Sequence, residues 1–192
     1  MILSKILLES KEESIINQLN NFYKTIDYGT VIDGKKYVDD GIHNEMTWQV
    51  IDKAHLLSPK EIEKYRVGTC YDTTGYSFRK FASNSIPFKC YLASTRKYYN
   101  VKRGIWDDPV HTFIICKNSD DKWRWVEGSW FTYKNNRYII SDYRELVDII
   151  HQHINKENGK SYLRDVTSYP TSGCSYHDFY KLLMTHYLPM KD

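Results

Sequence analysis

The sequence predicts an α+β fold, with helices towards both ends of the chain and a mostly antiparallel sheet between them. Apolar residues recur at helical spacing after residue 10 and again after residue 141. Between these regions, short runs rich in Val, Ile, Tyr and Trp alternate with turn residues. Helices segregated from a run of strands are typical of α+β domains. No repeat or Pro/Gly/Ser-rich linker divides the chain, so we expect a single domain over residues 1–192.

The first half of the chain carries three start signals for regular structure. Ser10-Lys11-Glu12-Glu13 is a capping-box pattern, and it predicts that the first helix begins there. Asp33-Gly34 separates two β-forming runs and predicts a hairpin. Ser58-Pro59-Lys60-Glu61 combines an N-cap with a proline suited to the first helical position, and it predicts a short helix that ends by Gly68.

The second half of the chain predicts the sheet and further helices. Thr69-Cys70-Tyr71-Asp72 repeats the capping pattern and predicts a helix over about 70–82. Runs of β-forming residues bounded by turn residues predict strands over 88–93, 110–116, 122–127 and 138–140. The last two helices are expected after Ser141-Asp142 and over Tyr176–Tyr187.

Composition argues against several classes of protein. Hydrophobic residues make up 41% of the chain, which supports a folded core, and the net charge of +3 does not by itself predict nucleic-acid binding. No segment approaches the ~20 apolar residues needed to span a bilayer, and the N-terminus lacks a signal-peptide cleavage site. The four cysteines are not spaced as a disulfide framework. We therefore expect reduced thiols in a cytoplasmic protein that has no membrane partner.

Three residues form a candidate catalytic triad: Cys70, His111 and Glu127. With Thr69 as the N-cap, Cys70 is the first helical residue, where free N–H groups and the positive end of the helix dipole stabilise a thiolate. The N–H of Cys70 is also a candidate oxyanion donor. An imidazole can act as the base for such a thiol, and a carboxylate can orient the imidazole. This combination of groups attacks amides and thioesters.

The spacing of two predicted strands relates His111 to Glu127. A hairpin that pairs His111 with Glu127 also sets Phe113 opposite Trp125. These side chains then share one face, so that Glu127 can hold one imidazole nitrogen while the other faces Cys70. A slip of one residue would send the carboxylate to the opposite face. The register of this hairpin is therefore a direct structural test.

The segments around these residues resemble the transglutaminase-like superfamily of bacterial or phage type, within the papain-like fold of cysteine enzymes. The resemblance covers about 58–154, roughly half the chain, with helical extensions on either side. Its motifs are Gly68-Thr69-Cys70-Tyr71-Asp72, His111-Thr112-Phe113 and Trp125-Val126-Glu127-Gly128-Ser129-Trp130. It implies a nucleophile at the N-terminus of a helix that packs on a mostly antiparallel sheet.

The resemblance also implies the roles of the site residues. Cys70 is expected to be the nucleophile, His111 its base, and Glu127 the acid that orients the histidine, at a position where Asp is more frequent. The expected enzyme is a thiol hydrolase or acyltransferase of the protease, deamidase or transglutaminase type. It would attack an amide of a protein or peptide through a thioester, without a metal or cofactor. Tyr71, Trp125 and Trp130 are expected to line the substrate cleft, with a core role as an equal alternative for Trp125.

Three other interpretations remain open. A non-catalytic transglutaminase-like binding module is supported by Glu127 in place of Asp. The basic and aromatic stretch 96–103 would suit nucleic acid, but Asp107 and Asp108 soon offset its charge, and we favour a solvated loop. A zinc site is disfavoured because two of its four donors lie two residues apart on a predicted helix and would point to different sides. The four donors are His151, His153, Cys174 and His177. The sequence does not set an oligomeric state.

Overall fold

The computed structural model describes the chain in residues 2–39, 45–94, 99–100, 105–106, 110–117, 122–126, 128, 139–142, 144–145, 148, 162–165, 175 and 178. Within these residues, helices accompany antiparallel sheets, so the predicted α+β class is confirmed. None of the described helices is long and apolar enough to cross a membrane. Nearly all of the helix expected over Tyr176–Tyr187, and most of the one expected after Asp142, lie outside the described residues.

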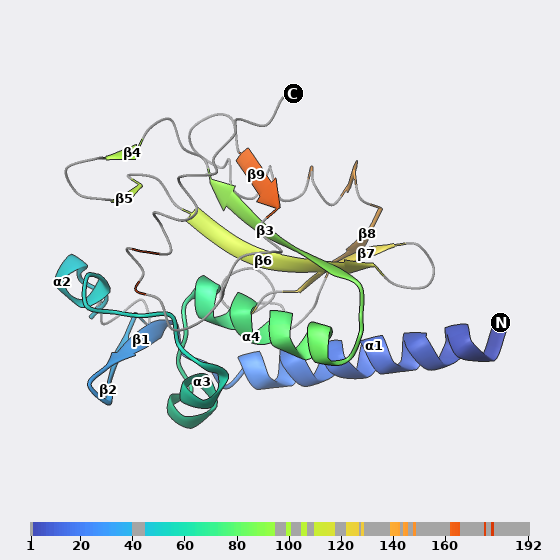
Figure 1. Ribbon diagram of the computed structural model, residues 1–192, viewed down its shortest axis with the longest axis horizontal. Helices are drawn as coiled ribbons and strands as arrows, with labels where there is room; N and C mark the ends of the chain where they lie inside the picture. Colours follow the sequence, from blue (N-terminus) through green and yellow to red (C-terminus); the bar gives the residue numbers. More distant parts are fainter. Residues whose placement is uncertain are drawn as a thin grey trace.

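A five-stranded antiparallel sheet lies at the centre of the described chain (Figure 1). Its strands follow the spatial order β8-β7-β6-β3-β9. The bounds are β3 Phe88–Ser94, β6 Val110–Lys117, β7 Trp123–Val126, β8 Ile139–Ser141 and β9 Tyr162–Asp165. Four of these strands match predicted runs, whereas β9 was not predicted. β9 pairs with the outer edge of β3. The two strands lie far apart in the sequence, so no hairpin pattern could predict this pairing.

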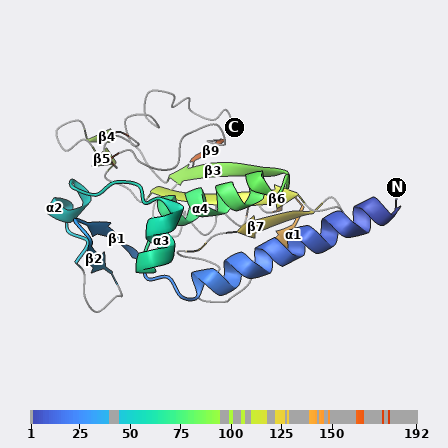
Figure 2. The same cartoon turned by 60° about the horizontal axis from the view of Figure 1, so that its bottom comes forward.

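Two helices, α1 (Ile2–Tyr23) and α4 (Cys70–Ser83), lie side by side below the sheet (Figures 1 and 2). α4 packs against β6 and β3, and α1 packs against α4 and, through Glu12, against Arg124 of β7. Tyr23 fixes the contact between the helices, because its hydroxyl donates a hydrogen bond to the carbonyl of Thr73 at 2.7 Å and is also hydrogen-bonded to Ser77. The helix that begins with Cys70 is therefore in contact with both the sheet and α1.

A hairpin and two short helices precede α4. The hairpin joins β1 (Gly29–Ile32) to β2 (Lys35–Val38) through Asp33-Gly34, as predicted. Both turn residues have positive φ, 50° and 78°, a conformation that Asp and Gly tolerate better than most residues. The short helices are α2 (Trp48–Ile51) and α3 (Pro59–Tyr65), and the second confirms the predicted Ser58 cap. A separate two-stranded sheet joins β4 (Tyr99–Asn100) to β5 (Ile105–Trp106).

The first helix begins at Ile2 and not at Ser10, so its predicted start is wrong. The capping pattern lies inside the helix, because residues 2–9 are helical as well and include good helix formers such as Leu7 and Leu8. Glu12 is 2% exposed, and its carboxylate lies 3.7 Å from the guanidinium of Arg124 on β7, so this part of α1 packs against the sheet.

The central strand β6 separates two groups of buried side chains. Side chains alternate along a strand, so the even-numbered and odd-numbered residues of β6 face opposite ways. Ile114 and Cys116 belong to the core cluster that also contains Cys70, on the α4 face. Phe113 is equally buried but lies on the other face, where its ring packs against Trp125. This division decides how the candidate site residues are placed.

Candidate functional site

Cys70 is the first residue of α4, as the sequence predicted. Thr69 is the N-cap and has an extended backbone, with φ −83° and ψ −179°. The first N–H groups of a helix have no carbonyl partner within it, so they are available beyond the helix start. The side chain of Cys70 is only 3% exposed. The sulfur therefore lies in a buried position at the end of a helix that favours negative charge.

A buried carboxylate fixes this helix start. Asp72 is fully buried, and its Oδ2 accepts hydrogen bonds from the backbone N–H and the hydroxyl of Thr69, both at 2.8 Å. Its Oδ1 accepts a hydrogen bond from the N–H of Leu57 at 2.7 Å. The sequence predicted the capping pattern but missed the bond to Leu57. No local pattern predicts a bond between residues 15 apart.

His111 is the second residue of β6 and is 6% exposed. Its ring stacks on that of Phe113, with the ring centroids 6.1 Å apart and the planes 25° from parallel. Phe113 in turn packs on Tyr91 and Trp125, at centroid distances of 6.0 and 5.1 Å. The imidazole thus stacks on one member of a buried aromatic cluster.

The starts of α4 and β6 lie at the same end of the helix–sheet layer in both views (Figures 1 and 2). The two elements run in the same direction and pack on one another. Alternation along β6 nevertheless places His111 on the face opposite α4, with Phe113, whereas Cys70 belongs to the cluster on the α4 face. α4 and β6 therefore begin at the same end of the layer, but the side chains of Cys70 and His111 do not lie on the same face of the sheet.

The predicted register between β6 and β7 is wrong by two residues. Trp125 pairs with Ile115 and not with Phe113, so the turn is centred one residue later than predicted. Because side chains alternate with a period of two, this shift leaves Trp125 on the same face as His111. The described part of β7 ends at Val126, and the predicted acid Glu127 lies outside the described residues.

Two of the three residues predicted to line a cleft are described, and both are buried. Tyr71, next to Cys70 in α4, is 7% exposed and belongs to the core cluster. Trp125 is 0% exposed and packs on Phe113, as its alternative core role would require. Trp130 lies outside the described residues.

Two other buried thiols serve as references for the reactivity of Cys70. Burial raises the pKa of the Cys90 thiol, and the negative charge of Asp165 raises it further. Burial also raises the pKa of the Cys116 thiol, and the carboxylate of Glu12, which accepts a hydrogen bond from this thiol at 3.7 Å, adds to the effect. Both thiols should therefore stay protonated and unreactive at neutral pH.

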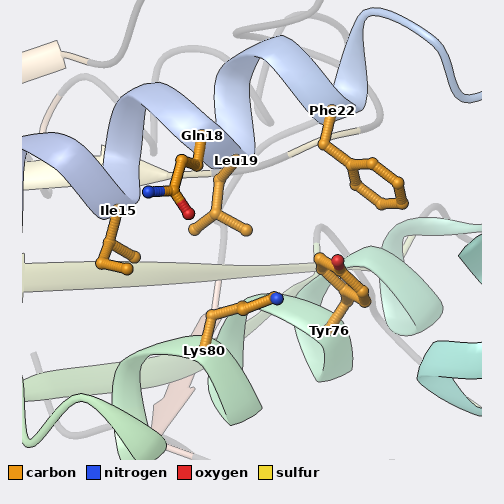
Figure 3. A pocket seen from close by; sticks show the side chains of 6 residues that line it. All are labelled: Ile15, Gln18, Leu19, Phe22, Tyr76 and Lys80. Carbon is orange, nitrogen blue, oxygen red and sulfur yellow. The ribbon is translucent and has the colours of Figure 1, made fainter.

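A cavity of about 200 Å³ lies between α1 and α4 (Figure 3). Phe22 of α1 and Tyr76 of α4 stack at one end of it, with ring centroids 4.6 Å apart. The hydroxyl of Tyr76 donates a hydrogen bond to Glu63 at 2.8 Å. Lys80 reaches along the cavity towards the Tyr76 ring, with its ammonium 5.3 Å from the centroid. Neither Cys70 nor His111 lines this cavity, so it is separate from the chemistry proposed for them.

The structure describes few of the residues on which the zinc and nucleic-acid interpretations depend. All four donors of the zinc alternative lie outside the described residues, as does most of the stretch 96–103. In the described part of the chain, no three His, Cys, Asp or Glu side chains are grouped so that they could hold a metal ion.

Comparisons with known proteins do not identify a family. No family model matches the chain, and no curated protein matches it. The transglutaminase-like resemblance therefore depends on the sequence motifs alone.

Proposed function

We propose that the protein is a thiol-dependent acyl-transfer enzyme of transglutaminase-like, papain-related architecture. Cys70 is the nucleophile, His111 its base and Glu127 the acid that orients the histidine. One observation carries this proposal: α4 begins with Cys70 and packs along β6, whose second residue is His111. The common end of these two elements is where a thiol and an imidazole from opposite faces of the sheet can approach one another.

In the proposed reaction, the Cys70 sulfur attacks the carbonyl carbon of a protein or peptide amide, and the thiol proton passes to His111. N–H groups at the start of α4 stabilise the resulting oxyanion. The C–N bond then breaks, the amine leaves with the proton from His111, and the acyl group stays on Cys70 as a thioester. Attack by water releases a carboxylic acid, and attack by an amine releases a new amide. Either step regenerates the thiol.

The thiol provides the first test. The protein is treated with iodoacetamide at neutral pH, and the alkylation of each cysteine is followed by peptide mass spectrometry. Cys70 should react at least about tenfold faster than Cys90 or Cys116, because it lies at a helix start whose N–H groups favour a thiolate, whereas the other two lie in strands near carboxylates. Equal rates for the three thiols would reject Cys70 as an activated nucleophile.

Turnover of p-nitrophenyl acetate, a generic acyl donor, provides the second test. Cys70→Ala should abolish it, and His111→Ala should reduce it by roughly 100-fold or more, since a positioned base contributes about 10²–10⁴-fold. Circular dichroism of both variants should match that of the parent protein. Undiminished turnover in folded Cys70→Ala would refute the mechanism.

A non-catalytic binding module is the second candidate. The 3% exposure of Cys70 favours it, because a substrate carbonyl must reach the sulfur. A module of this kind predicts that Cys70 reacts no faster than the reference thiols and that Cys70→Ala leaves any hydrolysis of p-nitrophenyl acetate unchanged. The same two assays therefore separate the candidates.

A further inference from the structure

The carboxylate of Asp72 joins two segments that are distant in sequence at the start of α4. It accepts hydrogen bonds from Thr69, the residue before Cys70, and from Leu57, in the segment that leads into α3. Both segments are buried: Leu57 is 1% exposed and Thr69 is 5% exposed. Burying a carboxylate is costly unless several donors compensate it, and three donors do so here. A helix cap alone would not need the bond to Leu57.

The start of α3 provides a direct comparison. There Glu61 accepts hydrogen bonds from the N–H and the hydroxyl of Ser58, at 2.8 and 2.7 Å, as Asp72 does from Thr69. The side chain of Glu61 remains 34% exposed, and it also pairs with His55. The two carboxylates thus perform the same local capping. Only Asp72 is fully buried, and only Asp72 caps the helix that begins with Cys70.

We propose that Asp72 is a positioning residue for the Cys70 nucleophile. Through its bonds to Thr69 and Leu57, it fixes the first turn of α4 against the neighbouring segment, and so holds the sulfur and the adjacent N–H groups in one geometry. This inference rests on the function proposed above. It goes beyond that proposal by assigning a role to a residue outside the triad.

Turnover makes the inference testable. Loss of positioning would lower kcat, since displacement of a reacting group by about 1 Å can cost roughly 100-fold. A purely structural role would leave kcat unchanged once the variant has folded.

The test compares Asp72→Asn with Glu61→Gln, the matched change at the start of α3. Each full-length variant is assayed for kcat and KM with p-nitrophenyl acetate. Asp72→Asn should lower kcat by roughly 10- to 100-fold and leave KM within about twofold. Glu61→Gln should leave both values within about twofold of the parent. A folded Asp72→Asn protein with unchanged kcat would overturn the inference.

A milder pair of variants covers the case in which Asp72→Asn does not fold. Thr69→Ala removes only the hydroxyl donor to Asp72, whereas Thr69→Ser keeps it. Thr69→Ala should lower kcat by roughly three- to tenfold, and Thr69→Ser should restore it. Equal kcat in Thr69→Ala and the parent would overturn the inference. Two outcomes separate the inference from the proposed function. If Cys70→Ala loses turnover but Asp72→Asn keeps a normal kcat, only the role of Asp72 is refuted. If Cys70→Ala keeps full turnover, the proposed function itself is refuted.

Discussion

A buried cluster of charged groups joins α1 to the sheet, and its replacement should have a large and specific effect on stability. The guanidinium of Arg124 lies 3.7 Å from the carboxylate of Glu12 and is also paired with Glu13. The side chains of Arg124 and Glu12 are 13% and 3% exposed, whereas that of Glu13 is 40% exposed. Removal of one partner from a buried ion pair typically costs about 3–5 kcal/mol, because the other charge stays buried.

We therefore expect Arg124→Met to lower the free energy of unfolding by about 3 kcal/mol. This is the low end of the range, because Glu12 keeps the hydrogen bond from the Cys116 thiol. The double variant Glu12→Leu/Arg124→Met removes both charges and fills the space with apolar groups, so it should lie within about 1 kcal/mol of the parent. Glu13→Gln is the control, and it should cost no more than about 1 kcal/mol because its side chain is solvent-exposed.

Urea unfolding at pH 7 measures these differences, provided that the m-value stays constant across the four proteins. The informative quantity is the difference in stability between Arg124→Met and the double variant, which should favour the double variant by about 2 kcal/mol. The reasoning fails if Arg124→Met costs less than about 1 kcal/mol, or if the double variant is no more stable than Arg124→Met.

Two further predictions concern the start of α3 and the contact between Gly128 and α1. Burial alone would raise the pKa of the Glu61 carboxyl, but hydrogen bonds from Ser58 and the nearby His55 outweigh it and hold that pKa below the ordinary value of 4.5. A lowered pKa stabilises the fold above pH 4.5 and loses this effect as the pH falls through the folded-state pKa, so the Tm advantage of the parent over Glu61→Gln should shrink between pH 6 and pH 3. A constant difference in Tm would contradict this linkage. Gly128→Ala would place a Cβ 2.6 Å from a ring carbon of Tyr23, whose hydroxyl is anchored on α4, so we expect a loss of about 1–3 kcal/mol in the same urea assay. An unchanged midpoint would show that the ring moves aside freely.

Local chemistry explains which elements could be predicted from the sequence. The Asp33-Gly34 hairpin, the Ser58 cap and the helix that begins at Cys70 each depend on residues within one turn of the feature, and all three are confirmed. The start of α1 was predicted wrongly because the capping pattern at Ser10 lies within a longer helix that begins at Ile2. β9 was missed because its partner strand lies far away in the sequence.

In the candidate site, too, local sequence patterns predicted local features but not the relation between distant segments. The position of Cys70 at a helix start follows from its neighbours, whereas its relation to His111 depends on how α4 crosses the sheet. The register error illustrates the difference: the spacing of apolar residues correctly predicted that Trp125 shares a face with Phe113, because faces repeat every two residues. It could not predict which residue stands directly opposite, because the turn sets that choice.

The two faces of the sheet impose a condition on the proposed mechanism. Along most of β6, a side chain on the His111 face is separated from α4 by the strand itself, because β6 is paired with β3 over residues 110–116. His111 is paired with Ala93, one residue from the end of this ladder, so the proposed mechanism requires its imidazole to reach past the start of the strand towards Cys70. Cys70 and His111 are the first residue of α4 and the second of β6, and these starts lie at the same end of the layer (Figures 1 and 2). The proposed mechanism therefore depends on the ends of the two elements rather than on their packed middles, which is why a carboxylate that fixes the first turn of α4 should matter for the rate.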